Sequence, residues 1–226
     1  MKIEKIVNKI AQENTYLLSN STSHLIIDPG SDSSALLERL KITDKTISAI
    51  LLTHAHFDHI MGLNELRKHF PDVPIYLHSD EKEWMKNPKL NASLFFLGTA
   101  VTGPEADYFY EINQFYDIDA FKFQVLETPG HSIGGVSLLF TLENKSFVFS
   151  GDALFKNAIG RWDLPTGNQV QLLKSIREQL FTLDEILKSF LVMVPKQVLV
   201  LKNKIILFSN KKKLLILLSV TFLFRF

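Results

Sequence analysis

Leu-Leu-Thr-His-Ala-His-Phe-Asp-His-Ile-Met-Gly, residues 51–62, overlaps the end of the apolar run Ile47 to Leu52, which is typical of a buried strand. Imidazole nitrogens and carboxylate oxygens are ligands of zinc, iron and manganese. On extended backbone, side chains two residues apart project to the same side, whereas side chains beyond a bend can face a second metal. The stretch therefore predicts two adjacent metal sites, built from His54, His56, Asp58 and His59.

The alternative is that these side chains are ordinary solvated or helix-capping groups, as most isolated histidines are. The chain has seven histidines, and three of them lie in this stretch beside an aspartate, which favours metal binding. The histidines His24, His69 and His78 lack such neighbours, and we expect them at the surface or at helix ends.

Two later segments carry further ligand-type residues: Thr128-Pro129-Gly130-His131-Ser132-Ile133-Gly134-Gly135 and Phe149-Ser150-Gly151-Asp152-Ala153-Leu154-Phe155. Together with the pattern His-x-His-x-Asp-His they resemble, in order and at similar separations, the motifs of the metallo-β-lactamase superfamily. The segment Gly160-Arg161-Trp162-Asp163-Leu164-Pro165 resembles the short glyoxalase II-like thioesterase branch of that family. The resemblance runs from about Ile3 to Leu183.

The resemblance implies an α/β fold, the αββα sandwich, in which two sheets pack face to face with helices outside and the metals lie at one rim. It implies that His54, His56 and His131 hold the first metal, that Asp58 and His59 hold the second, and that Asp152 bridges them. Two Zn²⁺ ions are expected, with iron or manganese as alternatives. The family also places the pair Arg161 and Asp163 beside the metal centre, although alone it would be read as a surface salt bridge.

Asp28 precedes Pro29 at the end of an expected strand, and two interpretations stay open. Its carboxylate can orient a metal-bound histidine, as carboxylates commonly do. It can equally form an Asx turn, which needs no such role.

The composition sets limits on the function. A chain of 226 residues with 46% hydrophobic residues can build one sizeable globular domain, and a net charge of +1 gives no argument for nucleic acid. The absence of cysteine excludes disulfides and thiolate ligands. The N-terminus lacks the apolar stretch of a signal peptide, so we expect a cytoplasmic protein. The expected partner is a small-molecule thioester, and the oligomeric state is not determined by the sequence.

Periodicity and turn signals predict the remaining elements. Asp32 or Ser31 can cap the first predicted helix. The segment from Asp80 to Tyr110 is less regular, and its aromatic residues either cover the pocket or pack in a core. The predicted strands are Ile3–Val7, Thr15–Leu18, Leu25–Ile27, Val73–Leu77, Phe121–Glu127, Val136–Phe140 and Ser146–Phe149; the predicted helices are Ser33–Leu40, Leu63–Phe70 and Gln169–Leu180, the last with Val170, Leu172, Leu173, Ile176 and Leu180 on one side.

The C-terminal part departs from the family. After Leu183 the family continues into Pro-Gly-His-Gly-Pro, whose histidine completes the second metal site, whereas this chain has no histidine beyond His131. We therefore divide the chain into a hydrolase domain, residues 1–186, and an aberrant apolar and basic tail, residues 187–226. The run Leu214 to Phe224 follows three lysines but is far shorter than the ~20 apolar residues that span a membrane. A peripheral anchor and an aggregation-prone segment are the alternatives.

We hypothesise that a single-base frameshift near residues 186–188 accounts for the departure. Methionine is encoded by ATG, so reading one base earlier forces a glycine across Met193 and Val194 and permits a histidine just before it. Carried from Phe190 to Phe208, allowed codons yield Pro-Gly-His-Gly-Pro-Lys-Thr-Ser-Ile-Gly-Phe-Glu-Lys-Gln-Asn-Asn-Pro-Phe, which is the absent family segment. We predict that the first metal is retained and that the second binds more weakly.

The function that the resemblance implies is hydrolysis of a thioester of the hydroxyacylglutathione type. Divalent metals lower the pKa of water and polarise the substrate carbonyl, and Asp58 can orient that water or accept its proton. Glutathione itself is not expected, because the extra helical domain that binds it in full-length glyoxalase II is missing from the sequence. A mononuclear iron persulfide dioxygenase, which resembles this branch through His54, His131 and Asp152, is one alternative, and a non-catalytic remnant is another.

Overall fold

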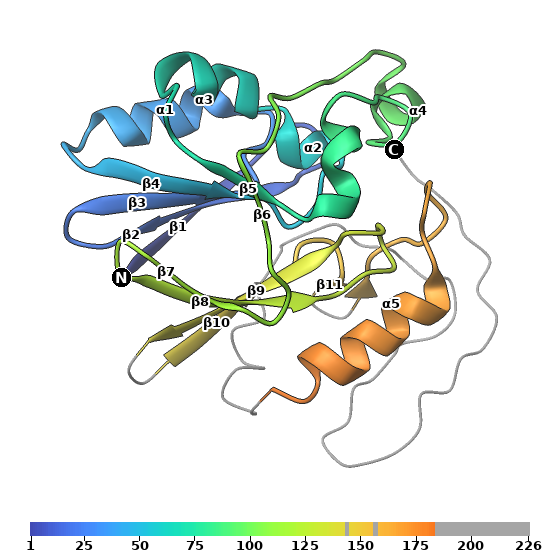
Figure 1. The fold of residues 1–226 in the computed structure, drawn as a ribbon. Coiled ribbons are helices and arrows are strands. Elements are labelled where there is room, and N and C mark those ends of the chain that lie inside the picture. The colour runs from blue at the N-terminus through green and yellow to red at the C-terminus, as the bar shows by residue number, and fades with distance from the viewer. Residues whose placement is uncertain (143–144, 156–157, 184–226) are drawn as a thin grey trace.

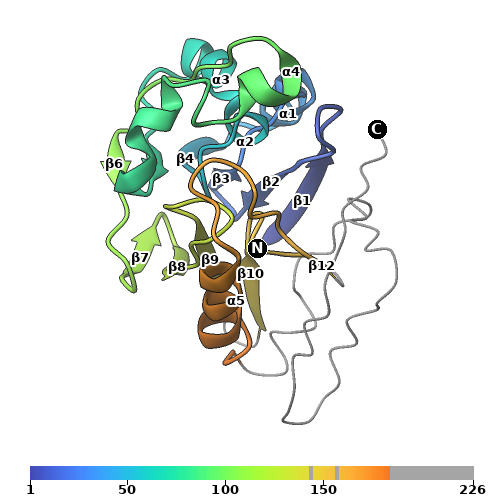
Figure 2. The ribbon, with the colours of Figure 1, turned by 90° about the vertical axis from the view of Figure 1, so that its right-hand side faces the viewer.

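The computed structural model describes residues 1–142, 145–155 and 158–183, so the predicted tail lies outside the described residues. Within them a six-stranded and a four-stranded sheet pack face to face, and helices cover the outer face of each (Figures 1 and 2). This is the predicted αββα sandwich.

The first sheet has the order β1-β2-β3-β4-β5-β6. Strands β1 to β3 are antiparallel, whereas β3 to β6 run parallel to one another. Parallel strands end at the same edge of a sheet, and ligand sites form there. The strands are β1 (Lys2–Val7), β2 (Asn14–Ser19), β3 (Ser23–Ile27), β4 (Thr46–Leu51), β5 (Ile75–Leu77) and β6 (Tyr108–Phe109); the helices among them are α1 (Ser33–Lys41), α2 (Phe57–Ile60), α3 (Leu63–His69), the 3₁₀ helix η1 (Ser79–Met85) and α4 (Ser93–Leu97).

The second sheet is antiparallel with the order β10-β9-β8-β7. Its strands are β7 (Phe115–Ile118), β8 (Phe121–Glu127), β9 (Val136–Leu142) and β10 (Lys145–Phe149), and a small ladder joins β11 (Leu154–Phe155) to β12 (Ala158–Ile159). Helix α5 (Gln169–Ser175), continued by the π-helical turn η2 (Ile176–Leu180), covers the outer face of this sheet (Figure 1).

Three apolar layers hold the sandwich together. The central layer, between the sheets, contains Leu25 and Leu51 from the first sheet and Phe123 and Phe140 from the second. A second layer joins the first sheet to α1, α3 and η1, and a third joins the second sheet to α5 and η2. The two sheets are therefore fixed to each other by buried side chains, so that the loops at their common rim are held at a set distance.

The predicted strands and helices all occur, and none of their ends is shifted by more than two residues. Two details were wrong. Val170 is 78% exposed, so it does not belong to the buried side of α5. His24 lies buried inside β3 and not at the surface. Asp32 is the N-cap residue of α1, as predicted, but its carboxylate makes no capping hydrogen bond and instead accepts the backbone N–H of Lys9 at 2.5 Å.

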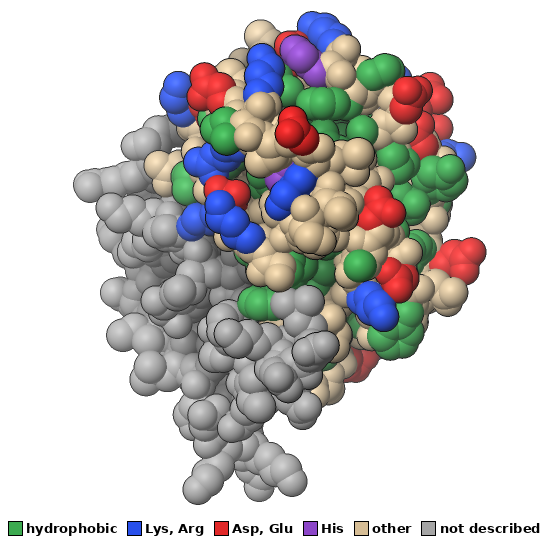
Figure 3. All heavy atoms as spheres, turned by 90° about the vertical axis from the view of Figure 1, so that its left-hand side faces the viewer, with side chains coloured by type: hydrophobic (Ala, Val, Ile, Leu, Met, Phe, Trp, Pro, Cys, Tyr) green, Lys and Arg blue, Asp and Glu red, His purple; other side chains and the backbone are tan. Residues whose placement is uncertain are grey.

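The surface of the described residues carries charges of both signs. On the face in Figure 3, basic and acidic side chains alternate among apolar and polar ones. In residues 1–142, 145–155 and 158–183, no helix is long and apolar enough to cross a membrane.

Candidate metal centre

The loops at one rim of the sandwich bring the predicted site residues together. Asp28 directly follows β3, the segment Thr53 to His59 follows β4, and the two later motifs follow strands of the second sheet. Those motifs deliver His131 after β8 and Asp152 after β10. The site therefore draws side chains from both sheets.

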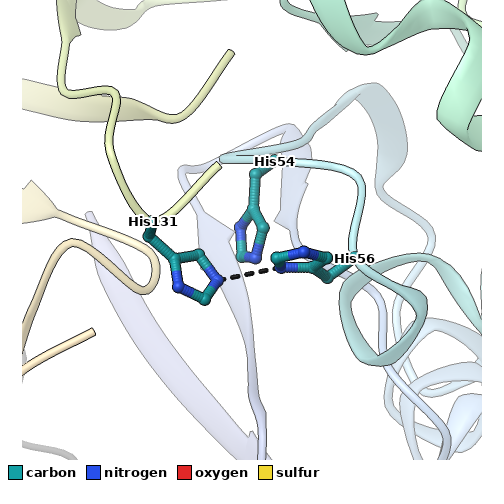
Figure 4. A group of neighbouring side chains, drawn as sticks. All are labelled: His54, His56 and His131. Atoms are coloured by element: carbon teal, nitrogen blue, oxygen red, sulfur yellow. Dashed lines mark hydrogen bonds between the residues drawn. The ribbon is translucent and has the colours of Figure 1, made fainter. Parts of the chain in front are cut away.

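His54, His56 and His131 form a first group, with one ring nitrogen of each within 4.8 Å of the others. All three side chains are buried, and Figure 4 shows them converging from two loops. The ring atoms His56 Nδ1 and His131 Nε2 are 2.9 Å apart. This spacing places three imidazoles around one point.

Hydrogen bonds to the outer ring nitrogens determine where the lone pairs point. His131 Nδ1 donates to the carbonyl oxygen of Arg161 at 2.8 Å, so its Nε2 keeps a lone pair for the centre. Thr53 Oγ1 donates to Asp28 Oδ2 at 2.6 Å, so at 3.1 Å it accepts from His54 Nδ1. The Nε2 atom of His54 is then a bare acceptor, and it has no hydrogen-bond partner among the described residues. A buried lone pair without a partner on His54, beside two further imidazoles, fits a divalent transition metal.

His54, His59 and Asp152 form a second, adjoining group. His59 Nε2 lies 3.4 Å from Asp152 Oδ1 and 3.8 Å from Asp58 Oδ2. The other carboxylate oxygen of Asp152 lies 3.7 Å from His131 Nε2. Asp152 thus stands between the two groups, where a bridging carboxylate is required.

The charges of the site are strongly coupled. Burial, followed by repulsion from the neighbouring imidazoles, holds the pKa values of His54 and His56 well below the usual range, so both rings are neutral. Burial also raises the pKa of Asp58 to about 6. At Asp152 burial is outweighed by the contact with His59, which lowers the pKa to about 2. Neutral imidazoles in the first group are in the protonation state that a metal requires. Although burial lowers the pKa of His59, the charges of Asp58 and Asp28 raise it well above the usual range, so a metal in the second group would displace that proton.

Asp28 connects the strand ends to the second group. Its carboxylate accepts the backbone N–H and the hydroxyl of Thr53 at 2.7 and 2.6 Å, and Oδ2 lies 3.1 Å from His59 Nδ1. Of the two interpretations left open by the sequence, this contact supports the orienting one.

Arg161 and Asp163 form a two-point ion pair, with N–O distances of 2.7 and 2.8 Å. The hydrogen bond that reaches His131 is accepted by the backbone carbonyl of Arg161. The guanidinium lies 5.1 Å from the centre of the Phe96 ring, so this arginine links the His131 loop to α4.

Two buried carboxylates near the site were missed by the sequence analysis. Glu13 Oε1 lies 3.9 Å from His59 Nδ1, and Glu81 accepts hydrogen bonds from backbone N–H groups beside the histidine motifs. Each is a single acidic residue in a polar segment, so no local pattern distinguishes it. The one usable signal for Glu81 was its position just after β5, at the edge where the other site residues lie.

A pocket opens on the side of the second group. Its lining includes the site residues Asp28, Asp58, His59 and Asp152 and the aromatic residues Tyr16, Phe149 and Phe155.

Comparisons with known proteins identify the family that this chain resembles in sequence and in fold. The family model of the Metallo-beta-lactamase superfamily matches residues 9–189 of this chain. A probable metallo-hydrolase from Streptococcus pyogenes is 44% identical over 188 residues, which cover 81% of this chain and 79% of the relative. A protein named hydroxyacylglutathione hydrolase GloC, from Haemophilus influenzae, is 33% identical over 188 residues, with 82% and 87% covered.

Two solved structures are also similar. The crystal structure of BLEG-1 B3 metallo-beta-lactamase aligns with a TM-score of 0.76 and 40% identity over 81% of this chain and 87% of its own. The crystal structure of TTHA1623 in a di-iron-bound form aligns with a TM-score of 0.67 and 33% identity over 80% and 87%. Relatives of this fold therefore carry more than one hydrolase name, and at least one of them holds iron.

Proposed function

This chain belongs to the metallo-beta-lactamase superfamily and is a metallo-hydrolase of that family, and from this premise we propose that it hydrolyses a small-molecule thioester of the hydroxyacylglutathione type. The observation that carries the proposal is the convergence of three neutral, buried imidazoles next to a second group that contains His59 and Asp152. Similarity to the relative named hydroxyacylglutathione hydrolase GloC supports the choice of a thioester.

Each residue has a separate part in the proposed reaction. His54, His56 and His131 would hold one metal; Asp58 and His59 would hold a second, and Asp152 would lie between them. When bound, such metals lower the pKa of water and polarise the substrate carbonyl. Asp58, which lines the pocket beside His59, would orient the attacking water and accept its proton. The acyl carbon gains an oxygen, the C–S bond breaks, and the sulfur leaves as a thiolate.

The second metal should bind more weakly than the first. It has Asp58, His59 and the shared Asp152, and the sequence supplies no further histidine after His131. Sequencing the DNA around codons 180–195 tests the frameshift that we infer. A chain restored to the family reading frame should bind the second metal at least about tenfold more tightly, since even outer partners of a metal contribute 10- to 100-fold.

The first experiment is a metal and activity measurement on the purified chain. We expect one tightly held divalent metal per chain, with a second retained only in excess metal, and release of thiol from an α-hydroxyacyl thioester. The variant Asp152→Asn, which removes the bridging charge, should lose at least about 100-fold in rate. Two tightly held metals in the chain as it stands would contradict the proposed weakness of the second site.

A β-lactam amide is the second candidate substrate, because the similar protein BLEG-1 is named a B3 metallo-beta-lactamase. Parallel assays with a chromogenic β-lactam and with a thioester separate the two. Oxygen consumption with a persulfide by a chain holding one iron would instead support a dioxygenase and refute both hydrolase assignments. A chain that binds metal but turns over none of the three classes would be a non-catalytic remnant.

A further inference from the structure

The carboxylate of Glu81 joins the two loops that carry the first histidine group. Its Oε2 atom accepts the backbone N–H of Ala55 at 2.5 Å, and its Oε1 atom accepts the backbone N–H of Gly134 at 2.9 Å. Ala55 lies between His54 and His56, and Gly134 lies three residues after His131. One buried side chain thus spans the two sources of the three imidazoles.

The burial of Glu81 argues against an incidental contact. Its side chain is completely buried, and an acidic group is kept in such a place only where hydrogen bonds compensate for lost solvation. Both partners are backbone groups whose N–H would otherwise be buried without an acceptor. Losing the carboxylate would therefore leave one buried N–H without an acceptor in each loop.

Helix η1 presents a second residue to the same group. Side chains three residues apart eclipse one another in a 3₁₀ helix, so Glu81 and Trp84 lie on one side. The Trp84 ring is buried and lies 5.3 Å from the His56 ring, centre to centre. His78, at the end of β5, fixes the start of η1 by accepting the backbone N–H of Asp80 at 3.2 Å.

Gly134 shows how closely the second loop approaches. A Cβ atom at this position would lie 2.9 Å from Glu81 Cγ and 2.9 Å from His78 Nδ1. Any side chain there would push η1 away from the His131 loop. The glycine and the glutamate therefore act as one contact.

We propose that Glu81 is a positioning residue for the first metal group: it fixes the loop of His54 and His56 and the loop of His131 at the separation that one divalent cation requires. The inference rests on the metal binding given under the proposed function. A second link, the hydrogen bond from Val136 N to Thr53 O at 2.9 Å, joins the same two loops without Glu81. Loss of Glu81 should therefore loosen the site without separating the sheets.

The test uses the full chain with the substitution Glu81→Gln, which keeps the size of the side chain but places an amide N–H₂ against one backbone N–H. Zn²⁺ affinity is measured by competition with a chromophoric chelator, and ligand geometry by the visible spectrum of the Co²⁺-substituted protein. We expect a 10- to 100-fold weaker first site and a changed Co²⁺ spectrum. Glu83→Gln, on the exposed side of the same helix, is the matched control and should leave both unchanged.

Glu81→Asp and Gly134→Ala provide independent variants if Glu81→Gln does not fold, as judged by circular dichroism. The aspartate restores the charge but is one methylene short, so its affinity should lie between those of wild type and Glu81→Gln. Wild-type affinity and an unchanged Co²⁺ spectrum in a folded Glu81 variant would overturn the proposal and leave Glu81 with a role in stability alone. Failure of the wild-type chain to bind Zn²⁺ would instead overturn the proposed function, so the two outcomes are distinct.

Discussion

At the scale of single residues, Asp28 affects the candidate metal centre through the two residues that it contacts, Thr53 and His59. Its carboxylate contacts Thr53 twice and His59 once, and through Thr53 it also determines which nitrogen of His54 is bare. The substitution Asp28→Asn replaces one acceptor oxygen by a donor that opposes the Thr53 hydroxyl or the His59 ring. We expect the second metal to bind 10- to 100-fold more weakly, as measured by Zn²⁺ titration.

The matched control for Asp28→Asn is Asp44→Asn, which removes a charge from an exposed turn. That variant should titrate like the wild type. Equal Zn²⁺ binding by Asp28→Asn and Asp44→Asn would show that Asp28 serves only to terminate β3.

The buried side chain of His24 leads to a separate prediction about how the stability of the fold depends on pH. Its ring nitrogens lie 2.8 Å from Ser19 Oγ and 2.7 Å from Thr43 Oγ1, and burial, with the charge of Lys45, lowers its pKa below 6.5. The folded chain then holds fewer protons than the unfolded chain just below pH 6.5. The stabilising contribution of neutral His24 is therefore complete above pH 6.5 and is lost as the pH falls toward its folded pKa.

The substitution His24→Gln tests that sign, because glutamine is polar but does not titrate. In metal-free protein, denaturant unfolding at pH 7 and pH 5 should show a larger loss of unfolding free energy on acidification for wild type than for the variant. The same pH dependence in both proteins would mean that His24 is not the group responsible. His69, which is exposed at the end of α3, gives a control substitution, His69→Gln.

The residues that could be predicted from the sequence are those that cluster along the chain or match a family motif. The close spacing of four ligand-type residues made them predictable: His54, His56, Asp58 and His59. The structure brings them to one rim of the sandwich with His131 and Asp152. Glu13 and Glu81 reach the site only through the pairing of β1 with β2 and the start of η1 after β5. Such contacts depend on tertiary structure, so periodicity and composition carry no sign of them.

At the scale of elements, α5 and the His131 loop depend on each other. Asn168 N donates to the carbonyl of Gly130 at 2.7 Å, and Ser175 Oγ donates to the carbonyl of Pro129 at 2.8 Å. Gly130 has a φ of +125°, and a Cβ atom there would lie 2.5 Å from Leu172 Cα. The loop can carry His131 toward the first group only with a glycine pressed against α5.

The substitution Gly130→Ala should therefore destabilise the chain by about 3 kcal/mol or more, combining backbone strain with a clash against helix backbone. Gly98→Ala is the matched control, because Gly98 also has a positive φ, +66°, but no described atom lies within 4 Å of its would-be Cβ. That change should cost only about 1–2 kcal/mol. Chemical denaturation measures the free energy of unfolding of both variants. Equal losses in Gly130→Ala and Gly98→Ala would mean that α5 moves away from the new methyl group at little cost.

The elements that sequence patterns located well are those with a clear period and turn residues at both ends. Strand β8 has the predicted bounds, Phe121–Glu127, because apolar and polar residues alternate along much of it. The edge strand β7, with exposed and half-buried residues, and the two-residue strands β6, β11 and β12 offer no such period. Their positions are set by pairing with neighbours, which propensity does not encode.

At the scale of the whole molecule, the candidate metal centre ties the two sheets together. His54 and His56 come from the end of a strand in the first sheet, whereas His131 and Asp152 follow strands of the second. A metal that binds all of them binds only the folded chain, because the unfolded chain does not hold these groups together. Its binding free energy is therefore added to the stability of the sandwich as a whole.

Removing the metal should lower the melting temperature of the wild-type chain. At a free metal concentration of about 1,000 times the dissociation constant, the bound metal contributes about 4 kcal/mol, or on the order of 8–16 °C for a domain of this size. Differential scanning calorimetry with and without a chelator measures the difference. His131→Ala, which removes the second-sheet ligand of the first group, should melt at nearly the same temperature in both conditions. A chelator effect as large in His131→Ala as in wild type would place the stabilising metal elsewhere, and the three imidazoles would then meet at the rim for a reason other than holding an ion.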